Sequence, residues 1–169
     1  MRKSRLGLTV LAVAGLGVAG VLSVPSQAAK GEGIDGLAGR WSGTGLVTWK
    51  NGRQEPYNCV VTYYLTEGGA AVKQLLKCND NRGGNEAKID LRTAMKFAGG
   101  QLTGRWEDRL YSLEGDVTGR VTARGFEANA SHPLFQARLE IDMTTSCEQS
   151  VTIRPSRDIE VITAKLKKC

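Results

Sequence analysis

The feature that most restricts the fold of this chain is an alternation of apolar and polar residues that recurs along most of its length. In the clearest case Phe135, Ala137, Leu139, Ile141 and Met143 alternate with Gln136, Arg138, Glu140 and Asp142. Successive side chains of a β-strand point to opposite faces, so this pattern predicts a strand with one dry face and one wet face. We find no long segment with the pattern of an amphipathic helix.

Ten strand-like segments follow one another, separated by short turns: 41–49, 56–66, 71–78, 87–97, 101–111, 113–123, 125–130, 135–145, 149–154 and 159–167. Asn51-Gly52 and Gly99-Gly100 are strong turn signals. Short consecutive connections favour an antiparallel meander, and closing such a sheet removes its exposed edges. The sequence therefore predicts an all-β fold, an antiparallel meander closed into a small β-barrel. A two-sheet β-sandwich is the alternative.

Two irregularities within the strands fit a strongly coiled barrel. Five glycines stand at in-phase positions inside predicted strands, where glycine serves bending or close approach: Gly43, Gly45, Gly104, Gly115 and Gly119. In the last segment the apolar residues change face between Val161 and Ile162. We therefore expect a β-bulge near Ile162.

Four cysteines follow the N-terminal segment: Cys59, Cys78, Cys147 and Cys169. An even number in a small exported chain indicates two disulfides, for which three connectivities are possible. If Cys59 faces Cys78 across an antiparallel pair, the turn falls on residues 67–70, where two glycines stand. Pairing Cys147 with Cys169 places a turn at residues 156–158, just after Pro155. The strand register therefore favours Cys59–Cys78 and Cys147–Cys169.

Metal binding and thiol redox chemistry are weaker interpretations of these cysteines. The chain has one histidine, His132, and no Cys-x-x-Cys spacing. Structural zinc sites combine several Cys and His ligands at short spacings, so we expect no metal site. His132 precedes Pro133 and is interpreted as a turn residue rather than a catalytic base.

The N-terminal segment has the three parts of a secretory signal peptide. Arg2, Lys3 and Arg5 precede an apolar run from residue 6 to residue 24, and small residues follow Pro25. We predict a signal peptide over residues 1–28, with cleavage after Ala28 or, alternatively, Ala29. A retained transmembrane anchor is the other interpretation, because the run is about long enough to span a bilayer.

Residues 29–36 are expected to be a flexible segment and residues 37–169 a single barrel domain. The whole chain holds 23 Lys and Arg against 17 Asp and Glu. Residues 1–28 contain three of the basic residues and no acidic one, so the mature chain carries 20 minus 17, or +3. That modest charge gives no support to nucleic-acid binding, which needs a clustered basic face.

A five-residue pattern occurs twice: Leu37-Ala38-Gly39-Arg40-Trp41 and Leu102-Thr103-Gly104-Arg105-Trp106. It has two interpretations. The barrel could consist of two duplicated halves, although the cysteines do not repeat with the pattern. Alternatively, a tryptophan that follows a glycine closes a barrel end in both places.

The segment Gly39-Arg40-Trp41 resembles the Gly-x-Trp motif that opens the first strand of the lipocalin and wider calycin group. The resemblance implies a barrel whose end is closed by Trp41, and a late arginine packed over that ring, for which Arg154 is the candidate. The chain departs from lipocalins in its larger number of strands and in lacking a C-terminal helix pattern. Most of the mature chain also resembles small secreted alphaproteobacterial proteins that share the Gly-Arg-Trp-Ser-Gly start and the paired cysteines.

No catalytic constellation is visible. There is no Gly-x-Ser-x-Gly motif and no glycine loop leading into a helix. Glu107 and Asp108 are adjacent and point to opposite faces, whereas Glu114 and Asp116 share a polar face. Asp108 is in phase with Trp106 and is expected to point inward and pair with an inward arginine. We therefore expect a protein that is not an enzyme and that needs no cofactor.

Two classes of function remain. The first is a periplasmic or secreted barrel that binds a small apolar ligand, with five aromatic residues on the inner face as the candidate site: Trp41, Tyr63, Phe97, Trp106 and Phe135. The second is a filled barrel that acts through its surface as an envelope interaction or structural protein, or as an inhibitor of an exported enzyme. An enclosed apolar cavity of at least about 300 Å³ with a mouth would favour the first class. We expect neither nucleic-acid partners nor stable membrane insertion after signal cleavage.

Overall fold

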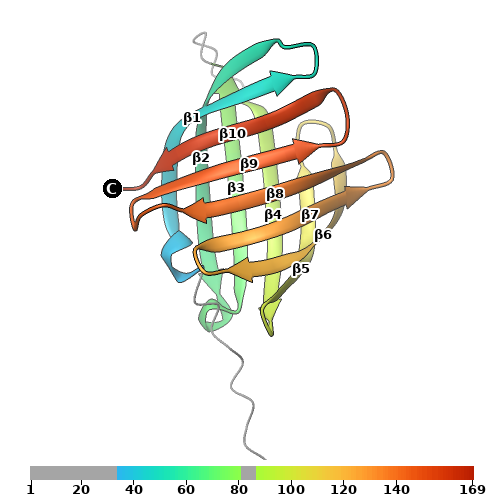
Figure 1. Ribbon diagram of the computed structural model, residues 1–169. Helices are drawn as coiled ribbons and strands as arrows, with labels where there is room; N and C mark the ends of the chain where they lie inside the picture. Colours follow the sequence, from blue (N-terminus) through green and yellow to red (C-terminus); the bar gives the residue numbers. More distant parts are fainter. Residues whose placement is uncertain (1–33, 81–86) are drawn as a thin grey trace, which may run out of the picture.

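In the computed structural model, which describes residues 34–80 and 87–169, the chain forms a closed antiparallel β-barrel of ten strands (Figure 1). Each strand pairs with its neighbours in sequence, and β1 pairs with β10 to close the barrel. This confirms the predicted meander and barrel and excludes the sandwich. The predicted signal peptide, with its cleavage site, lies outside the described residues.

The strands are β1 (Gly39–Trp49), β2 (Gln54–Thr66), β3 (Ala71–Asp80), β4 (Ala87–Ala98), β5 (Gln101–Asp108), β6 (Leu113–Thr122), β7 (Gly125–His132), β8 (Phe135–Met143), β9 (Glu148–Pro155) and β10 (Ile159–Lys167). Two short 3₁₀ turns accompany them, η1 (Asp35–Leu37) before β1 and η2 (Glu67–Gly69) between β2 and β3. The elements thus agree in number and order with the sequence, and the differences concern their ends.

The largest difference in a strand boundary lies in β5, which ends at Asp108 rather than at residue 111. The Oδ1 atom of Asp108 accepts hydrogen bonds from the backbone N–H groups of Leu110 (2.8 Å) and Tyr111 (3.2 Å). Aspartate binds the backbone of following residues in this way in turns, which competes with the strand ladder. The prediction that the strand continues through residue 111 was therefore wrong.

Both predicted disulfides are present. Cys59 lies directly opposite Cys78 in the β2–β3 register, and the two are bonded and buried. Cys147 lies in the β8–β9 turn and is bonded to Cys169, which follows β10. The first disulfide therefore joins two paired strands inside the barrel, and the second ties the C-terminal residue to a neighbouring turn.

The in-phase glycines and the bulge also agree with a coiled barrel. A Cβ atom on Gly43, Gly104 or Gly119 would collide with a backbone carbonyl of the adjacent strand, so these positions bring the strands closer than a side chain allows. The β1–β10 register shifts between Thr48 and Trp49, which pair with Val161 and Ile159 and leave Glu160 unpaired. The bulge thus lies two residues before Ile162 and brings both isoleucines to the inner face.

The two ends of the barrel differ. We call closed end the one with η1 and the turns after β2, β4, β6 and β8, and open end the opposite one, with the turns after β1, β5, β7 and β9. At the closed end at most one inward side chain per strand is half-buried, as with Leu65 and Met143. At the open end three successive inward positions of β8 are half-buried: Phe135, Ala137 and Leu139. The packed core therefore occupies the middle and the closed end.

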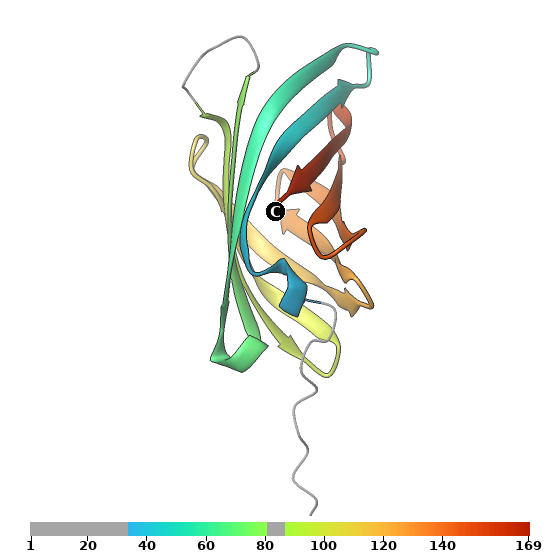
Figure 2. The same ribbon diagram turned by 90° about the vertical axis from the view of Figure 1, so that its left-hand side faces the viewer.

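The closed end is filled by η1 and Trp41. Ile34, Leu37 and Trp41 are completely buried, and Trp41 Nε1 donates a hydrogen bond to the Leu37 carbonyl (2.7 Å). Figure 2 shows η1 between the opposing walls of the barrel. Ile34 belongs to the segment expected to be flexible, and its burial means that the packed barrel already includes this residue.

The cation over the Trp41 ring is Lys168, not Arg154. Lys168 Nζ lies 4.8 Å from the ring centroid and donates to the Gly36 carbonyl (2.6 Å). Arg154 is exposed on the outer face and pairs with Glu140. The expectation drawn from the lipocalin resemblance was therefore wrong, because position 154 has outward parity on β9 whereas the chain end after β10 returns to η1.

Candidate functional site

The inner wall of the open end is apolar and partly accessible to solvent. Its half-buried apolar residues come from strands all around the barrel: Tyr57, Ile89, Leu91, Leu113, Ala130, Phe135, Leu139 and Ile153. Apolar side chains that face a lumen and keep contact with water are a feature of ligand sites, because a bound apolar molecule would remove that contact. This wall is the candidate functional site.

Three rings form a cluster on this wall. Trp106 of β5 contacts Phe135 of β8 with ring centroids 5.3 Å apart, and His132 of β7 with centroids 6.1 Å apart. His132 and Phe135 are themselves 5.6 Å apart. The indole Nε1 of Trp106 donates to the Ser131 carbonyl (3.3 Å) and so fixes the ring against β7. The cluster brings three strands together at the rim of the open end.

From the sequence, His132 was expected to act only as a turn residue. Its Nδ1 accepts a hydrogen bond from the Leu134 backbone N–H (3.1 Å), which agrees with the turn role expected for it. However, the residue ends β7 with inward parity, opposite Phe135, so its ring also belongs to the aromatic cluster. The parity of β7 could have indicated this, but the predicted strand ended at residue 130.

The other predicted aromatic site residues lie at the closed end. Trp41, Tyr63 and Phe97 are buried, with exposed fractions of 0%, 2% and 8%, and Trp106 at the open end is also buried, at 6%. Trp41 and Tyr63 stand on adjacent strands at the closed end, away from the Trp106 cluster. Of the five candidates, only Trp106 and Phe135 therefore lie at the open end. The half-buried aliphatic residues beside them, such as Leu91 and Leu113, were not singled out, although strand parity places them inward.

Polar groups inside the barrel lie beside the closed end. The Tyr63 hydroxyl reaches Gln149 Oε1 at 3.4 Å, and burial raises the pKa of Tyr63 far above its ordinary value. The phenol is therefore neutral. Gln149 is 2% exposed, and its Nε2 atom has no hydrogen-bond partner among the described residues. This buried donor faces the core and not the accessible wall.

The acidic residues singled out in the sequence all lie among the described residues, and each is engaged in a turn or surface contact. Asp108 is half-buried, and its carboxylate binds the turn backbone instead of the inward arginine expected for it. That expectation was wrong because β5 ends at this residue. Glu107 pairs with Arg109 (3.5 Å), whereas Glu114 and Asp116 share Arg105 (3.3 and 3.2 Å). These carboxylates are thus engaged in turn and surface contacts.

Within residues 34–80 and 87–169 no group of three or more His, Cys, Asp or Glu side chains could hold a metal ion. In the same part of the chain no helix is long and apolar enough to cross a membrane.

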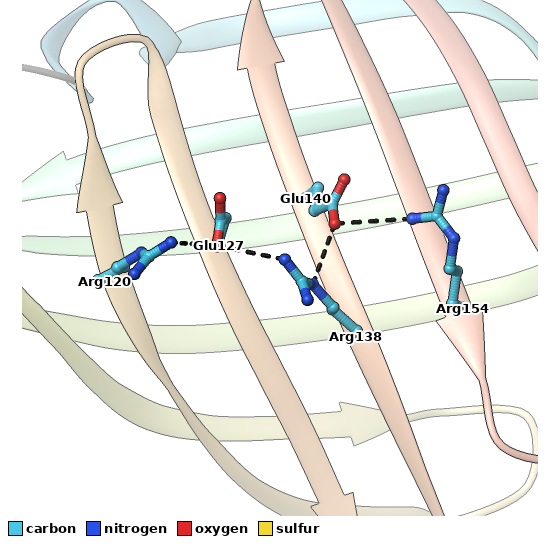
Figure 3. A network of polar contacts seen from close by, with 5 residues as sticks. All are labelled: Arg120, Glu127, Arg138, Glu140 and Arg154. Atoms are coloured by element: carbon cyan, nitrogen blue, oxygen red, sulfur yellow. Dashed lines mark hydrogen bonds and ion pairs between the residues drawn. The ribbon is translucent and has the colours of Figure 1, made fainter.

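The outer face of β6–β9 carries a ladder of alternating charges (Figure 3). Arg120 pairs with Glu127 (2.9 Å), Glu127 with Arg138 (3.5 Å), Arg138 with Glu140 (3.0 Å) and Glu140 with Arg154 (3.6 Å). Glu127 and Glu140 are direct cross-strand neighbours, as are Arg138 and Arg154, so the diagonal pairs offset two unfavourable like-charge pairs. All five side chains are partly exposed, which limits the stability that they contribute.

Two hollows of about 530 and 460 Å³ lie on this outer face. The first is lined by residues of β5–β8 that include Arg120, Glu127 and Arg138, and the second by residues of β6–β9. Both are open and polar. Neither is the enclosed apolar cavity that would mark a lumen-binding barrel, so the case for the lumen depends on its accessible apolar wall.

No family model and no curated protein sequence matches this chain. Among solved structures the barrel is similar to that of Rv2717c from M. tuberculosis, with a TM-score of 0.64 and 14% identity over 80% of this chain and 94% of that one. It is also similar to an S-type phycobiliprotein lyase from Guillardia theta, with a TM-score of 0.54 and 13% identity over 79% of this chain and 86% of that one.

These structural neighbours are β-barrels of the calycin or lipocalin-like kind, and at such low identity the likeness establishes the fold alone. This chain shares their barrel architecture, here with ten strands, two disulfides, one packed end and one accessible end.

Proposed function

We propose that this protein is an exported, non-catalytic barrel that binds a small apolar ligand through its open end. The observation that carries the proposal is that inward side chains are more exposed to solvent at the open end of the barrel than at the closed end. On β8 three successive inward positions of the open end are half-buried, whereas on the same strand only Met143 is half-buried at the closed end. A wall built only for stability would gain from burying these side chains as well.

Export is supported by the two disulfides, since such bonds persist mainly in oxidising compartments. The signal-like N-terminus points the same way. Together they support a periplasmic or secreted protein.

The direct test is mass spectrometry of lipophilic extracts from the natively purified protein, followed by titration with fatty acids, hopanoids and tetrapyrroles. We expect saturable quenching of tryptophan fluorescence by at least one class. Leu113→Asn should weaken this binding, because Leu113 lies on the inner wall of the open end. Leu65→Asn is the matched control, as Leu65 is also a half-buried inward leucine but lies at the closed end. A flat titration, or equal loss in both variants, would contradict the proposal.

A filled barrel that acts through its surface is the second candidate. The packed closed end and the two polar hollows on the outer face of β5–β9 favour it. In that case an interaction partner would contact the charged ladder. Arg138→Gln would then weaken partner binding, measured by isothermal titration with the captured partner, and ligand titrations would stay flat.

A further inference from the structure

A group of polar side chains lies on the inner wall of the open end, apart from the aromatic cluster. Glu55 and Tyr57 of β2 share the parity of the buried Cys59 and therefore face the lumen. Trp49 is the next inward residue of β1 after Val47, which lies directly opposite Glu55. The indole and the carboxylate are thus diagonal neighbours on the inner face. We call Trp49, Glu55 and Tyr57 the polar rim.

The members of the polar rim are joined by direct contacts. The guanidinium carbon of Arg53 lies 4.5 Å from the centroid of the Trp49 ring, and Arg53 Nε lies 3.6 Å from Glu55 Oε1. The Tyr57 hydroxyl donates a hydrogen bond to Glu55 Oε2 (2.9 Å). These contacts bring the indole, the carboxylate and the phenol together and hold the Glu55 carboxylate in place.

Glu55 is positioned to accept a further hydrogen bond. Its side chain is 23% exposed, whereas that of Glu114, on the outer face of the same end, is 71% exposed. A carboxylate has about four acceptor positions, so the contacts with Arg53 and Tyr57 leave room for another donor. Partial burial and the hydrogen bond to Glu55 raise the pKa of Tyr57, so the phenol stays neutral and keeps donating to Glu55.

Trp49 offers a donor without an acceptor. Its Nε1 atom is buried and has no hydrogen-bond partner among the described residues. In the same part of the chain this holds for one other side-chain atom, Gln149 Nε2, which faces the packed core at the closed end. A buried N–H without an acceptor is destabilising. Such a group on the wall of the accessible lumen is therefore suited to an acceptor that a ligand carries.

The polar rim is continuous with the accessible apolar wall. An inward row of residues, each directly opposite the next, crosses the barrel from β2 to β8: Glu55, Val47, Ile162, Ile153 and Leu139. The last two belong to the half-buried wall. The geometry therefore suits an amphiphilic molecule, with a polar head at β1–β2 and an apolar body against β8–β10.

We propose that the ligand of the open end is a neutral amphiphile whose head is a hydroxyl group. The hydroxyl oxygen would accept a hydrogen bond from Trp49 Nε1, and the hydroxyl hydrogen would be donated to Glu55. Because Nε1 is shielded from solvent, the head would displace the Arg53 side chain, which is itself 56% exposed. The inference deepens the proposed function and rests on it.

The donor and acceptor pattern of the polar rim selects the hydroxyl. A hydroxyl both accepts and donates, so it satisfies the indole N–H and the carboxylate at once. An ammonium group has no lone pair for the indole, and a carboxylate head cannot donate to Glu55 and is repelled by it. Asp80 lies opposite Tyr57 and is a second carboxylate on this side, while Arg53 is already paired with Glu55. A fatty acid would therefore contact the wall but bind more weakly.

The test is isothermal titration of the purified, disulfide-bonded protein with dodecanol, dodecanoate and chlorododecane. The affinity ratio of dodecanol to chlorododecane is the readout, since solvation of the free ligands is the same for every variant and cancels. Trp49→Phe should lower this ratio about tenfold, because it removes the N–H and keeps an aromatic ring. Unchanged selectivity in Trp49→Phe would overturn the proposal.

The carboxylate is tested separately through the affinity ratio of dodecanoate to dodecanol. Glu55→Gln should raise this ratio about fivefold, because it removes the repulsion of an anionic head. Glu114→Gln is the matched control, since Glu114 is also paired with an arginine at the open end but lies on the outer face, and it should leave both ratios unchanged. Unfolding temperatures of the three variants verify that the fold is intact.

Tighter binding of dodecanoate than of dodecanol by the wild-type protein would also overturn the proposal. If all three molecules bind and neither ratio responds to Trp49→Phe or Glu55→Gln, the hydroxyl preference fails and the apolar binding site stands. If none of the three binds, the proposed function fails together with this inference. The two failures are therefore distinguishable.

Discussion

The tryptophans of the two Leu-x-Gly-Arg-Trp segments lie near opposite ends of the barrel and have different structural roles. Trp41 is the third residue of β1, at the closed end, where it is completely buried. Trp106 comes two residues before the end of β5, at the open end, where its ring contacts the half-buried His132 and Phe135. The same five-residue pattern therefore supplies a tryptophan that fills the closed end in one place and a tryptophan that lines the inner wall of the open end in the other.

The surrounding residues explain the difference. Leu37 lies in the η1 turn and its carbonyl binds the Trp41 indole, whereas Leu102 is a strand residue of β5. Gly39 has a φ of 110° before the strand, whereas Gly104 allows close approach of β4. If the barrel consisted of two duplicated halves, the copy of a β1 motif would lie on β6. The second pattern lies on β5, which argues against duplication. A short motif thus places a tryptophan on the inner face of the barrel, and the residues around it determine its structural role.

The largest expected effect separates the two tryptophans by stability. Trp41→Ala should lower the free energy of unfolding by about 3–5 kcal/mol, because it leaves a cavity beneath η1 and frees the Leu37 carbonyl. Trp106→Ala should cost less, since its neighbours at the rim are already partly solvated. Urea unfolding measured by circular dichroism gives both values. An equal or smaller loss for Trp41→Ala would break the comparison.

Removal of the Cys147–Cys169 disulfide should be the next largest effect. The bond closes a loop with a sequence separation of 22 residues. The chain-entropy model values this at about 3 kcal/mol. Since the bond anchors the residue after Lys168, the double Cys→Ser variant should also release the closed end. Hydrogen exchange should then show faster exchange at Leu37 and Trp41 and unchanged exchange near Trp106. Faster exchange at both ends would mean that the ends are not independent.

Lys168→Met should cost about 1 kcal/mol, because it removes a cation from the Trp41 ring and a hydrogen bond to the Gly36 carbonyl. Lys165→Met is a suitable control, as Lys165 is exposed on the outer face of β10. Thermal unfolding of both variants measures the difference. If the two variants unfold at the same temperature, the contacts of Lys168 do not stabilise the closed end.

The smallest effect concerns the arginines of the two segments. Arg105 pairs with Glu114 and Asp116, whereas exposed Arg40 forms no ion pair with a described residue. Arg105→Gln should therefore cost less than about 1 kcal/mol at low salt and nothing measurable at high salt. Arg40→Gln should be neutral in both conditions. A salt-dependent loss for Arg40→Gln would show a partner for this arginine as well.

The fold could be predicted from the sequence because its signals are local. Alternation identified ten strands, turn residues identified their connections, and the register of Cys59 with Cys78 was correct residue by residue. The end of β5 was missed because Asp108 captures the turn backbone, a side-chain effect that alternation does not encode. The cation over Trp41 was missed because only the closed barrel brings Lys168 to η1.

The site was less predictable for the same reason. Parity correctly placed Trp41, Tyr63, Phe97, Trp106 and Phe135 on the inner face. Parity does not say at which depth of the lumen a residue lies, or which end is plugged. That depends on η1 and on the C-terminal Lys168, neither of which has a sequence signal of its own.

The central claim is that the closed end is structural and the open end binds ligand, and single-tryptophan variants test it most directly. One variant retains only Trp106 (Trp41→Phe, Trp49→Phe) and the other retains only Trp41 (Trp49→Phe, Trp106→Phe). Each is titrated with oleate while its fluorescence is recorded. The account predicts a saturable change in Trp106 emission and a constant Trp41 emission. A saturable response from Trp41 with a silent Trp106 would contradict it.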